Sequence, residues 1–171
     1  LETNRLGAIK VTEGPGFYRL TASYDEGRSI DSAPDAMDQD IPAFELPTIT
    51  NTVEGLALRG RSPAVIVGKL KAFFERDFRY TTWQEPPRRR LTNETPLQRF
   101  LTTDRAGHCE HFATATVLLL RAAGVPARYA VGYSVQEKKG RQWIIRERHA
   151  HAWSLAWIGG AWREVDNTPG T

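Results

Sequence analysis

The sequence contains a single cysteine, Cys109, and its position is the first feature that points to chemistry. It follows Gly107 and precedes an apolar run over residues 112–123, so it lies at or just before the first turn of an expected helix. The free N–H groups and positive dipole end of a helix N-terminus stabilise anions, and thiols placed there are more often nucleophilic thiolates. Gly107 would permit a tight turn and the close approach of a substrate. A lone cysteine is otherwise a small buried hydrophobic residue, so a nucleophile here needs partners.

Four histidines are the candidate bases for this thiol. His108 and His111 are close to Cys109 in sequence, but on a helix His111 at i+2 points away from it. These two are interpreted as structural or surface groups. His149 and His151 are expected on one strand at i and i+2, where their side chains share a face.

A predicted β-hairpin decides between the last two histidines. Gly159-Gly160 fits a two-residue turn between expected strands over residues 150–158 and 161–166. Pairing across this turn makes Asp166 the diagonal neighbour of His151 on the same face of the sheet, and places His149 one step farther away. A three-residue loop would instead place Asp166 on the opposite face.

These positions predict a site for cysteine-dependent acyl transfer. Cys109 is the predicted nucleophile. His151 takes the thiol proton and later donates a proton to the leaving amine, while Asp166 fixes the imidazole tautomer and stabilises the imidazolium. Such chemistry also needs an oxyanion hole, for which the backbone N–H of Cys109 is the first candidate donor.

The elements that position these residues follow from local signals along the chain. Ser62 and Pro63 fit the cap and first position of a helix, and apolar residues recur at helical spacing after them through about residue 76. Residues 78–81 are expected to be extended, and residues 95–101 to form a short helix.

The apolar run over residues 112–123 ends at Gly124-Val125-Pro126, which is a helix stop. This helix is apolar nearly all round and should therefore be central and buried. Local β connections after it imply an antiparallel sheet packed against the Cys-bearing helix, an α+β arrangement. The expected strands cover residues 127–135, 142–147, 150–158 and 161–166.

The first part of the chain is less informative. Residues 8–12 and 17–23 are β-like runs that flank the turn signal Glu13-Gly14-Pro15-Gly16, and they fit either a hairpin of this domain or the tail of a preceding β domain. Residues 29–47 are rich in Asp, Ser, Pro and Ala, and are interpreted as a loop or linker.

The motifs of the second half resemble the core of bacterial transglutaminase-like proteins, a family of the papain-like superfamily. The resemblance covers about residues 60–170, and departs from the family at Asn167, where proline is frequent. The motifs are found at residues 107–113, 120–128, 132–133, 151–153 and 162–169, with lead-in segments at 78–81 and 100–101.

The resemblance implies a papain/transglutaminase-like α+β fold with a Cys-His-Asp triad and no cofactor. It implies either acyl transfer from a glutamine side chain to an amine through a thioester, or hydrolysis of an amide or peptide bond. The partners would be a protein or peptide amide and an amine acceptor. The second oxyanion donor of the superfamily lies upstream of the cysteine, where Tyr80 and Trp83 are candidates that also fit the aromatic core or the wall of a cleft.

Composition narrows the functional classes. The chain has 171 residues, 25% of them charged, and a net charge of +3, which is too small a bias to imply nucleic-acid binding. Arg88-Arg89-Arg90 is interpreted as a solvated loop.

No apolar run approaches the ~20 residues of a membrane span. The chain starts without Met and is expected to be a piece of a longer protein, with any membrane tether outside it. The predicted organisation is a lead segment over residues 1–50 and a catalytic domain over residues 51–171. By resemblance, the domain is expected to be extracytoplasmic.

Two other functions remain open at this point. One is a zinc site, because His149 and His151, together with residues 108–111, supply suitable ligand types, although no spacing matches a zinc signature. The other is a non-catalytic module of the same fold that binds peptide or polysaccharide. The presence of all three triad residues argues against it.

Overall fold

The computed structural model describes residues 2–3, 9–10, 31–83 and 94–170. The helices are α1 (Leu46–Gly55), α2 (Pro63–Asp77), α3 (Pro96–Arg99) and α4 (Cys109–Ala122), with 3-10 turns at Ala36–Gln39 and Glu147–His149 and a π-helical turn at Phe100–Asp104. The strands are β1 (Glu2–Thr3), β2 (Ile9–Lys10), β3 (Arg79–Tyr80), β4 (Ala106–Gly107), β5 (Ala127–Tyr133), β6 (Glu137–Lys139), β7 (Gln142–Ile144), β8 (Ala150–Ile158) and β9 (Ala161–Val165).

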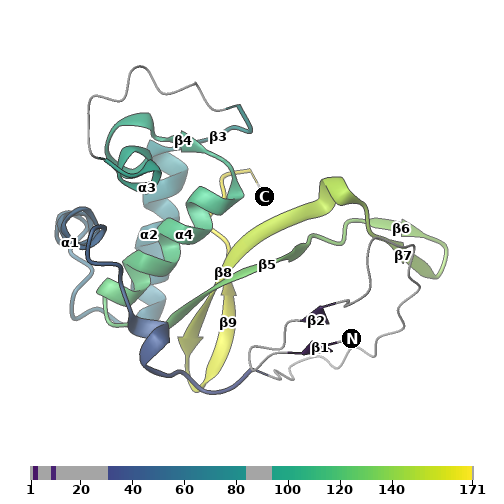
Figure 1. Ribbon diagram of the computed structural model, residues 1–171, viewed down its shortest axis with the longest axis horizontal. Helices are drawn as coiled ribbons and strands as arrows, with labels where there is room; N and C mark the ends of the chain where they lie inside the picture. The colour runs from purple at the N-terminus through teal and green to yellow at the C-terminus, as the bar shows by residue number, and fades with distance from the viewer. Residues whose placement is uncertain (1, 4–8, 11–30, 84–93, 171) are drawn as a thin grey trace.

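The centre of the molecule is α4, which packs against β8 and β5 on one side and against α1 and α2 on the other (Figure 1). Its side chains are buried around most of its circumference, as the apolar run predicted. It ends where predicted, because Gly124 adopts the left-handed conformation with φ of 88° and the Val125 N–H donates to the Leu120 carbonyl at 2.9 Å. The predicted α+β class is confirmed.

The main sheet is antiparallel with the strand order β5-β8-β9. β8 and β9 are joined by the two-residue turn Gly159-Gly160, and Ile158 pairs with Ala161 as predicted. Both glycines have positive φ, 63° and 79°, the conformation that this hairpin turn requires. Because the turn sets the register, it also sets which residues of the two strands share a face.

The core continues between α4 and the helices on its other side. A cluster of phenylalanine rings joins α2, the π-helical turn and α4, with ring centroids 4.9–6.3 Å apart. Offset and edge-to-face ring pairs add stability beyond the area they bury. The rings belong to Phe73, Phe74, Phe78, Phe100 and Phe112. Together these contacts hold α2 and the π-helical turn against α4.

α2 begins at Pro63 and is followed by the extended residues of β3, both as predicted, although the Ser62 side chain makes no capping hydrogen bond. α1 was not predicted, and part of it was interpreted as a linker. Its sequence is rich in threonine and poor in strong helix formers. It is helical because Ile49 and Val53, one turn apart, are fully buried in the core.

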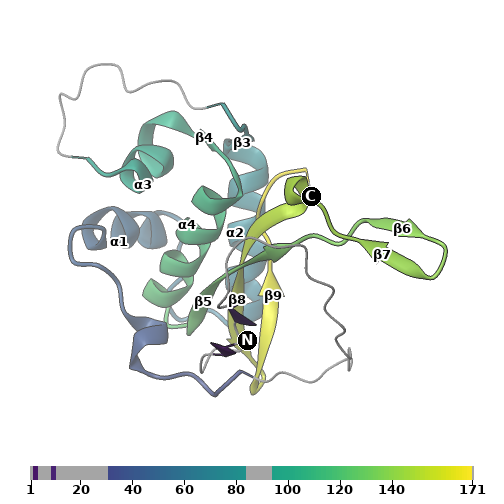
Figure 2. The same ribbon diagram turned by 45° about the vertical axis from the view of Figure 1, so that its right-hand side comes forward.

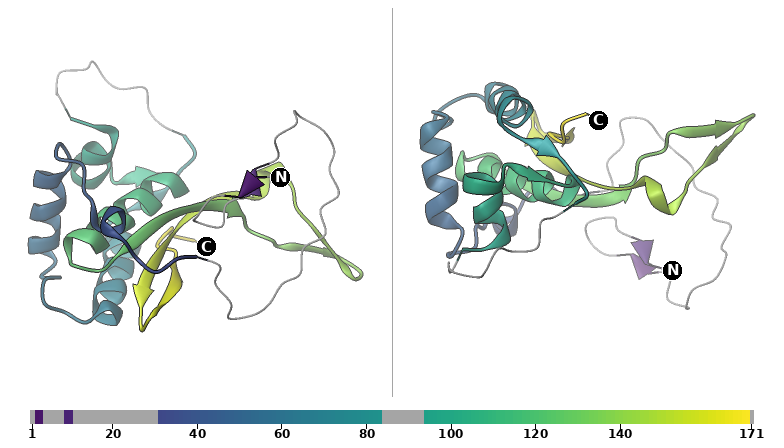
Figure 3. Two further views of the ribbon diagram at one scale, coloured as in Figure 1. Left: turned by 60° about the horizontal axis from the view of Figure 1, so that its bottom comes forward. Right: turned by 90° about the horizontal axis from the view of Figure 1, so that it is seen from above.

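The strand predicted over residues 142–147 is the second correction. β7 is shorter and pairs only with β6, so the two form a separate hairpin rather than a strand of the main sheet. The β5–β8 ribbon leaves the helical part of the molecule and carries this hairpin at its far end (Figures 2 and 3).

In the first part of the chain, Ile9–Lys10 pairs with Glu2–Thr3. The predicted turn at 13–16 and strand at 17–23, the Arg88-Arg89-Arg90 cluster and the start of the 29–47 loop lie outside the described residues.

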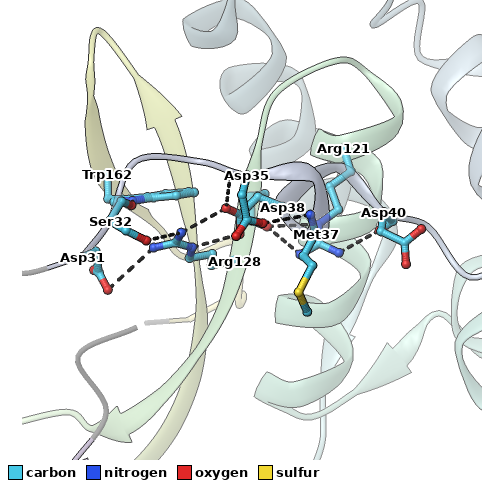
Figure 4. Close-up of polar contacts among 10 residues, drawn as sticks. Asp31, Ser32, Asp35, Met37, Asp38, Asp40, Arg121, Arg128 and Trp162 are labelled. Atoms are coloured by element: carbon cyan, nitrogen blue, oxygen red, sulfur yellow. Dashed lines mark hydrogen bonds and ion pairs between the residues drawn. The ribbon is translucent and has the colours of Figure 1, made fainter. Parts of the chain in front are cut away.

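A buried ion pair ties the segment before α1 to the sheet (Figure 4). The Arg128 guanidinium on β5 donates to both carboxylate oxygens of Asp38 at 2.9 and 3.0 Å and lies 4.0 Å from the centroid of the Trp162 ring. The Trp162 indole N–H in turn donates to the Ser32 carbonyl at 2.8 Å. This segment is therefore packed structure. α1 also crosses residue 50, the predicted boundary between the lead segment and the catalytic domain, and this division stays a prediction.

Across the described ranges, no helix is both long and apolar enough to cross a lipid bilayer.

Candidate functional site

Cys109 is the first residue of α4, at the helix N-terminus where the sequence placed it. The backbone that leads into it is held by β4, which pairs in parallel with β3, and the Thr81 N–H donates to the Gly107 carbonyl at 2.8 Å. The thiol is free and half-buried. The His108 side chain makes no capping hydrogen bond, so backbone N–H groups of the first turn remain available to an anion at the helix start.

His151 and Asp166 form the hydrogen bond that the hairpin register predicted. His151 Nε2 and Asp166 Oδ2 are 2.7 Å apart, and the two side chains are 17% and 30% exposed. The second carboxylate oxygen, Oδ1, accepts the Thr168 N–H at 2.9 Å. Because Asp166 engages Nε2, Nδ1 is the imidazole nitrogen left to exchange a proton with another group.

Asp166 directly follows β9, and the residues around it are anchored from two sides. Ser154 Oγ on β8 donates to the Val165 carbonyl at 2.5 Å, and Asn167 Nδ2 donates to Thr116 Oγ1 on α4 at 3.1 Å. All three polar side chains in these two contacts are buried. Neither Thr116 nor Asn167 was predicted as part of the site. The only signal for Thr116 was a polar residue within the apolar run, and Thr114 and Arg121 share it.

Cys109 and His151 lie at the same end of the helix–sheet layer. At the other end, the Trp157 N–H donates to the Pro126 carbonyl at 2.9 Å and joins β8 to the chain that leaves α4. From this junction α4 and β8 run side by side (Figure 1). The length of α4 back to Cys109 is about 20 Å at the helical rise, and the length of β8 back to His151 is also about 20 Å at the strand rise.

Trp153 packs beside the imidazole of His151. The two rings are nearly parallel, with an interplanar angle of 16° and centroids 6.2 Å apart. Gly132 on β5, which pairs with His151, makes room for the indole, because a Cβ at this position would lie 2.9 Å from Trp153 Cη2. The buried indole Nε1 has no hydrogen-bond partner among the described residues. Gly132 and Trp153 thus limit where the His151 ring can move.

Two tyrosines lie within electrostatic range of Cys109. Burial raises the pKa of Tyr80 and of Tyr129, and the charge of Cys109 raises both further; Glu110 also contributes at Tyr129. Tyr80 and Trp83 are 43% and 73% exposed, so neither is part of the aromatic core. The core was one of the two other interpretations of these residues, beside the wall of a cleft. As oxyanion donors both stay predictions.

His111 occupies the space that was expected to be open above Gly107. A Cβ on Gly107 would lie 2.9 Å from His111 Cγ, so the close approach permitted by this glycine is that of the imidazole. The His111 ring also packs against Phe100 at 5.3 Å and His108 at 4.5 Å. Burial lowers the pKa of His111, and the neighbouring His108 lowers it further. This is the structural role that was expected of it.

His149 is not on the strand, in contrast to the prediction. It ends the 3-10 turn before β8, and its Nδ1 accepts the Arg146 N–H at 3.2 Å. The two histidines of the zinc hypothesis are therefore engaged by different partners. No group of three or more His, Cys, Asp or Glu side chains within the described part of the chain is arranged to hold a metal ion.

Comparison with known proteins shows which family the sequence matches. The model of the family described as the transglutaminase-like superfamily matches residues 52–167. A protein-glutamine gamma-glutamyltransferase of Pseudomonas aeruginosa is 35% identical over 108 residues, which cover 61% of this chain and 15% of that protein. An uncharacterized protein of Bacillus subtilis, YebA, is 36% identical over 67 residues, covering 36% of this chain and 9% of its own length.

The fold has a close parallel among solved structures. The crystal structure of the periplasmic domain of TgpA from Pseudomonas aeruginosa superimposes with a TM-score of 0.64 at 28% sequence identity, covering 76% of this chain and 45% of that one. The same domain bound to ethylmercury gives the same TM-score and identity. The chain thus spans less than half of the structures and about one seventh of the curated relative that it matches.

Proposed function

Because the chain belongs to the transglutaminase-like superfamily, we propose that it is a cysteine-dependent acyltransferase that acts on amides through a thioester. Its proposed catalytic residues are Cys109, His151 and Asp166. The observation that carries the proposal is the 2.7 Å contact between His151 and Asp166 at the same end of the sheet as the helix that starts with Cys109. A carboxylate, an imidazole and a thiol in this order are the parts of an activated nucleophile.

In the first half-reaction the Cys109 thiol transfers its proton to His151, and the thiolate adds to the carbonyl carbon of a glutamine side chain. The C–N bond of the tetrahedral intermediate then breaks, and His151 returns the proton to the leaving nitrogen, which departs as ammonia. The enzyme is left as a thioester at Cys109. Asp166 stabilises the imidazolium that forms and holds the ring tautomer in which Nδ1 can accept the proton.

In the second half-reaction a primary amine attacks the thioester carbonyl. His151 takes a proton from the attacking nitrogen, the C–S bond breaks, and the thiolate recovers its proton from the imidazolium. The product is a substituted amide. When water replaces the amine, the same steps yield a carboxylate, and the net reaction is deamidation. Transfer therefore depends on an acceptor pocket that excludes water.

Both tetrahedral intermediates carry an oxyanion. The first donor proposed for it is the backbone N–H of Cys109, supported by the unsatisfied N–H groups and dipole at the start of α4. For the second donor Tyr80 is favoured over Trp83. Tyr80 pairs directly with Gly107 across β3 and β4, two residues before the nucleophile, whereas Trp83 lies beyond the end of β3.

The proposal extends to the setting of the enzyme. The solved relative is a periplasmic domain, which supports an extracytoplasmic location for this chain. The substrates would be protein or peptide amides, together with an amine acceptor, as the relative named protein-glutamine gamma-glutamyltransferase suggests. The reaction as written uses only side chains and backbone groups of the chain, and no metal or cofactor.

The proposal is tested by measuring ammonia released from a blocked glutaminylglycine dipeptide, with and without a primary amine. We expect release by the wild-type chain, no release by Cys109→Ala or His151→Ala, and wild-type release by His149→Ala, the matched histidine control. Incorporation of the amine identifies transfer, and free glutamate identifies deamidation. Wild-type release by Cys109→Ala would refute the proposal.

A chemical test addresses the distance between the two reacting groups. A short bifunctional alkylating agent such as 1,3-dibromoacetone should first alkylate Cys109 and then bridge to His151, and the crosslinked peptide can be identified by mass spectrometry. Iodoacetamide at neutral pH should label Cys109 rapidly in the wild type and slowly in His151→Ala. A thiol that is alkylated without any bridge to His151 would contradict the proposed pair.

A further inference from the structure

β5 is an edge strand of the main sheet. It pairs with β8 on one side, and no strand in the described part of the chain pairs with its other side. Natural proteins usually protect such edges with charged residues, proline, a bulge or a covering segment. The run from Tyr129 to Tyr133 contains neither charge nor proline, and it is paired in regular register throughout. It is thus open to pairing with another extended chain.

The register shows which backbone groups point outward along this edge. The Ser134 N–H donates to the His149 carbonyl, and the Trp157 N–H donates to the Pro126 carbonyl, so the even-numbered residues of this strand direct their backbone groups toward β8. In an antiparallel pair, the intervening residues direct theirs away from the partner strand. The N–H and C=O groups of Tyr129, Val131 and Tyr133 therefore point to the open side.

The side chains of the same three residues form an exposed apolar row. Tyr129, Val131 and Tyr133 are 42%, 68% and 52% exposed, and alternation along the strand places them on one face. An incoming strand that paired with these residues would place alternate side chains over this row. One short segment thus offers both the main-chain partners and the apolar surface that recognition by strand addition uses.

The row begins near the proposed nucleophile and leads away from it. Tyr129 lies within electrostatic range of Cys109, and β5 contacts the helix that Cys109 begins. From there the strand runs past Gly132, the partner of His151, to the β6–β7 hairpin (Figure 2). A chain bound along this edge would have one end at the site and the rest on the projecting ribbon.

We propose that the outer edge of β5 binds the acyl-donor polypeptide as an added extended strand, through the backbone groups and side chains of Tyr129, Val131 and Tyr133. This inference rests on the proposed acyl transfer and names its substrate class: an unfolded or loop segment of a protein, with apolar side chains at alternate positions next to the reactive glutamine. A small amide donor would reach Cys109 without using this edge.

The test measures binding apart from turnover, in the Cys109→Ala background. The probe is casein whose lysines are dimethylated, an unfolded polypeptide that carries glutamine but cannot serve as an amine acceptor. Val131→Pro removes an outward N–H and leaves the bonds to β8 in place, as proline on an edge strand does. We expect it to weaken casein binding at least tenfold. Val131→Thr keeps the N–H and the branched shape, and should bind within twofold of the parent.

Tyr133→Ser keeps the backbone intact and removes apolar surface, so we expect binding at least threefold weaker. It decides the test alone if Val131→Pro fails to fold. Val65→Ser, at a 45% exposed position on α2, is the matched surface control. Casein binding that Val131→Pro and Tyr133→Ser leave unchanged would overturn the inference. The absence of casein binding would also overturn it. So would a wild-type dimer that Val131→Pro dissociates, because the edge would then be occupied by a second copy of the chain.

The failures of the two proposals are distinguishable. If the wild-type chain releases ammonia from the blocked dipeptide but the Cys109→Ala variant does not bind casein, the edge is not the donor site and acyl transfer stands. If casein binds along β5 but neither donor yields ammonia, the edge binds polypeptide and the proposed reaction is wrong.

Discussion

Near its opposite ends the main sheet carries two pairs in which an aspartate binds a basic side chain, and the two pairs differ in their exposure to solvent. Arg128 and Asp38 have side chains that are only 6% and 7% exposed, with two hydrogen bonds between them and the Trp162 ring against the guanidinium. His151 and Asp166 are 17% and 30% exposed and share one hydrogen bond. The first pair is closed on all sides, and the second leaves one imidazole nitrogen available.

Burial gives the two pairs different consequences. Breaking a buried pair leaves an uncompensated charge in a medium of low dielectric constant, which is strongly destabilising. A partly exposed pair can change its protonation at lower cost, because solvent reaches the charge that remains. The closed pair is thus suited to hold the segment before α1 on the sheet. The open pair is suited to proton transfer, and the same Asp→Asn change at each pair should separate these two roles.

Asp166→Asn is expected to have the largest effect. The amide cannot stabilise the imidazolium and can present its NH₂ group to Nε2, which favours the wrong tautomer. We expect kcat for ammonia release to fall about a thousandfold, with an unfolding free energy within about 1 kcal/mol of the wild type. Steady-state kinetics and urea denaturation measure the two quantities. A variant that is strongly destabilised but equally active per folded molecule would reverse the assignment of roles.

Asp38→Asn should show the opposite pattern. Among the carboxylates of the described residues, Arg128 would keep only that of Asp31, 3.7 Å away. We therefore expect a loss of about 3 kcal/mol in unfolding free energy and unchanged activity of the folded protein. Urea denaturation measures the loss. Asp77→Asn is the matched control, because Asp77 pairs with a 71% exposed Arg76 and its replacement should cost much less unfolding free energy than that of Asp38. Equal losses in the two variants would show that burial does not distinguish these pairs.

The open pair was predictable from the sequence, and the closed pair was not. The Gly159-Gly160 turn sets a register, and a register relates His151 to Asp166 across a short, regular hairpin. Arg128 and Asp38 are 90 residues apart and belong to different elements, so no periodicity or turn relates them. The local signals at Pro63 and Gly124 likewise predicted where helices begin and end.

The missed features share this dependence on distant contacts. α1 has weak intrinsic helix propensity and is stabilised by the burial of Ile49 and Val53, which only the folded core supplies. The contact between Asn167 and Thr116 joins a strand end to a helix across 51 residues. The predicted strand at 142–147 failed because β-propensity does not specify the partner strand, and a local hairpin satisfied it instead.

Gly132→Ala tests how firmly the open pair is held. The new methyl group would lie 2.9 Å from the Trp153 indole and displace the ring that packs beside His151. A loosened imidazole should lower kcat about tenfold without abolishing activity, since small misplacements of catalytic groups are costly. Gly68→Ala is the control and should leave kcat unchanged, because the new Cβ would have no atom within 4 Å beyond its chain neighbours and the backbone of its own helix. Unaltered kcat in Gly132→Ala would show that Trp153 does not position His151.

The smallest expected effect concerns His111, a third polar group that is partly buried. Unlike Arg128 and His151, it has no carboxylate bonded to it among the described residues, and its Nδ1 has no hydrogen-bond partner there. Burial lowers its pKa below 6.5; His108 and Arg99 lower it further, and Glu110 and Asp104 act in the opposite direction. Below pH 6.5 the unfolded chain therefore binds more protons at this residue than the folded chain does, and stability is lost as the pH falls through the folded pKa. Above pH 6.5 this contribution is fully present.

The wild type should thus lose more unfolding free energy between pH 7.5 and 5.5 than His111→Phe, which keeps a ring against Phe100 but cannot titrate. Equal losses in urea titrations of the two proteins at both pH values would mean that His111 is hydrated in the folded state, and that the first turn of α4 is as open as the His151–Asp166 pair.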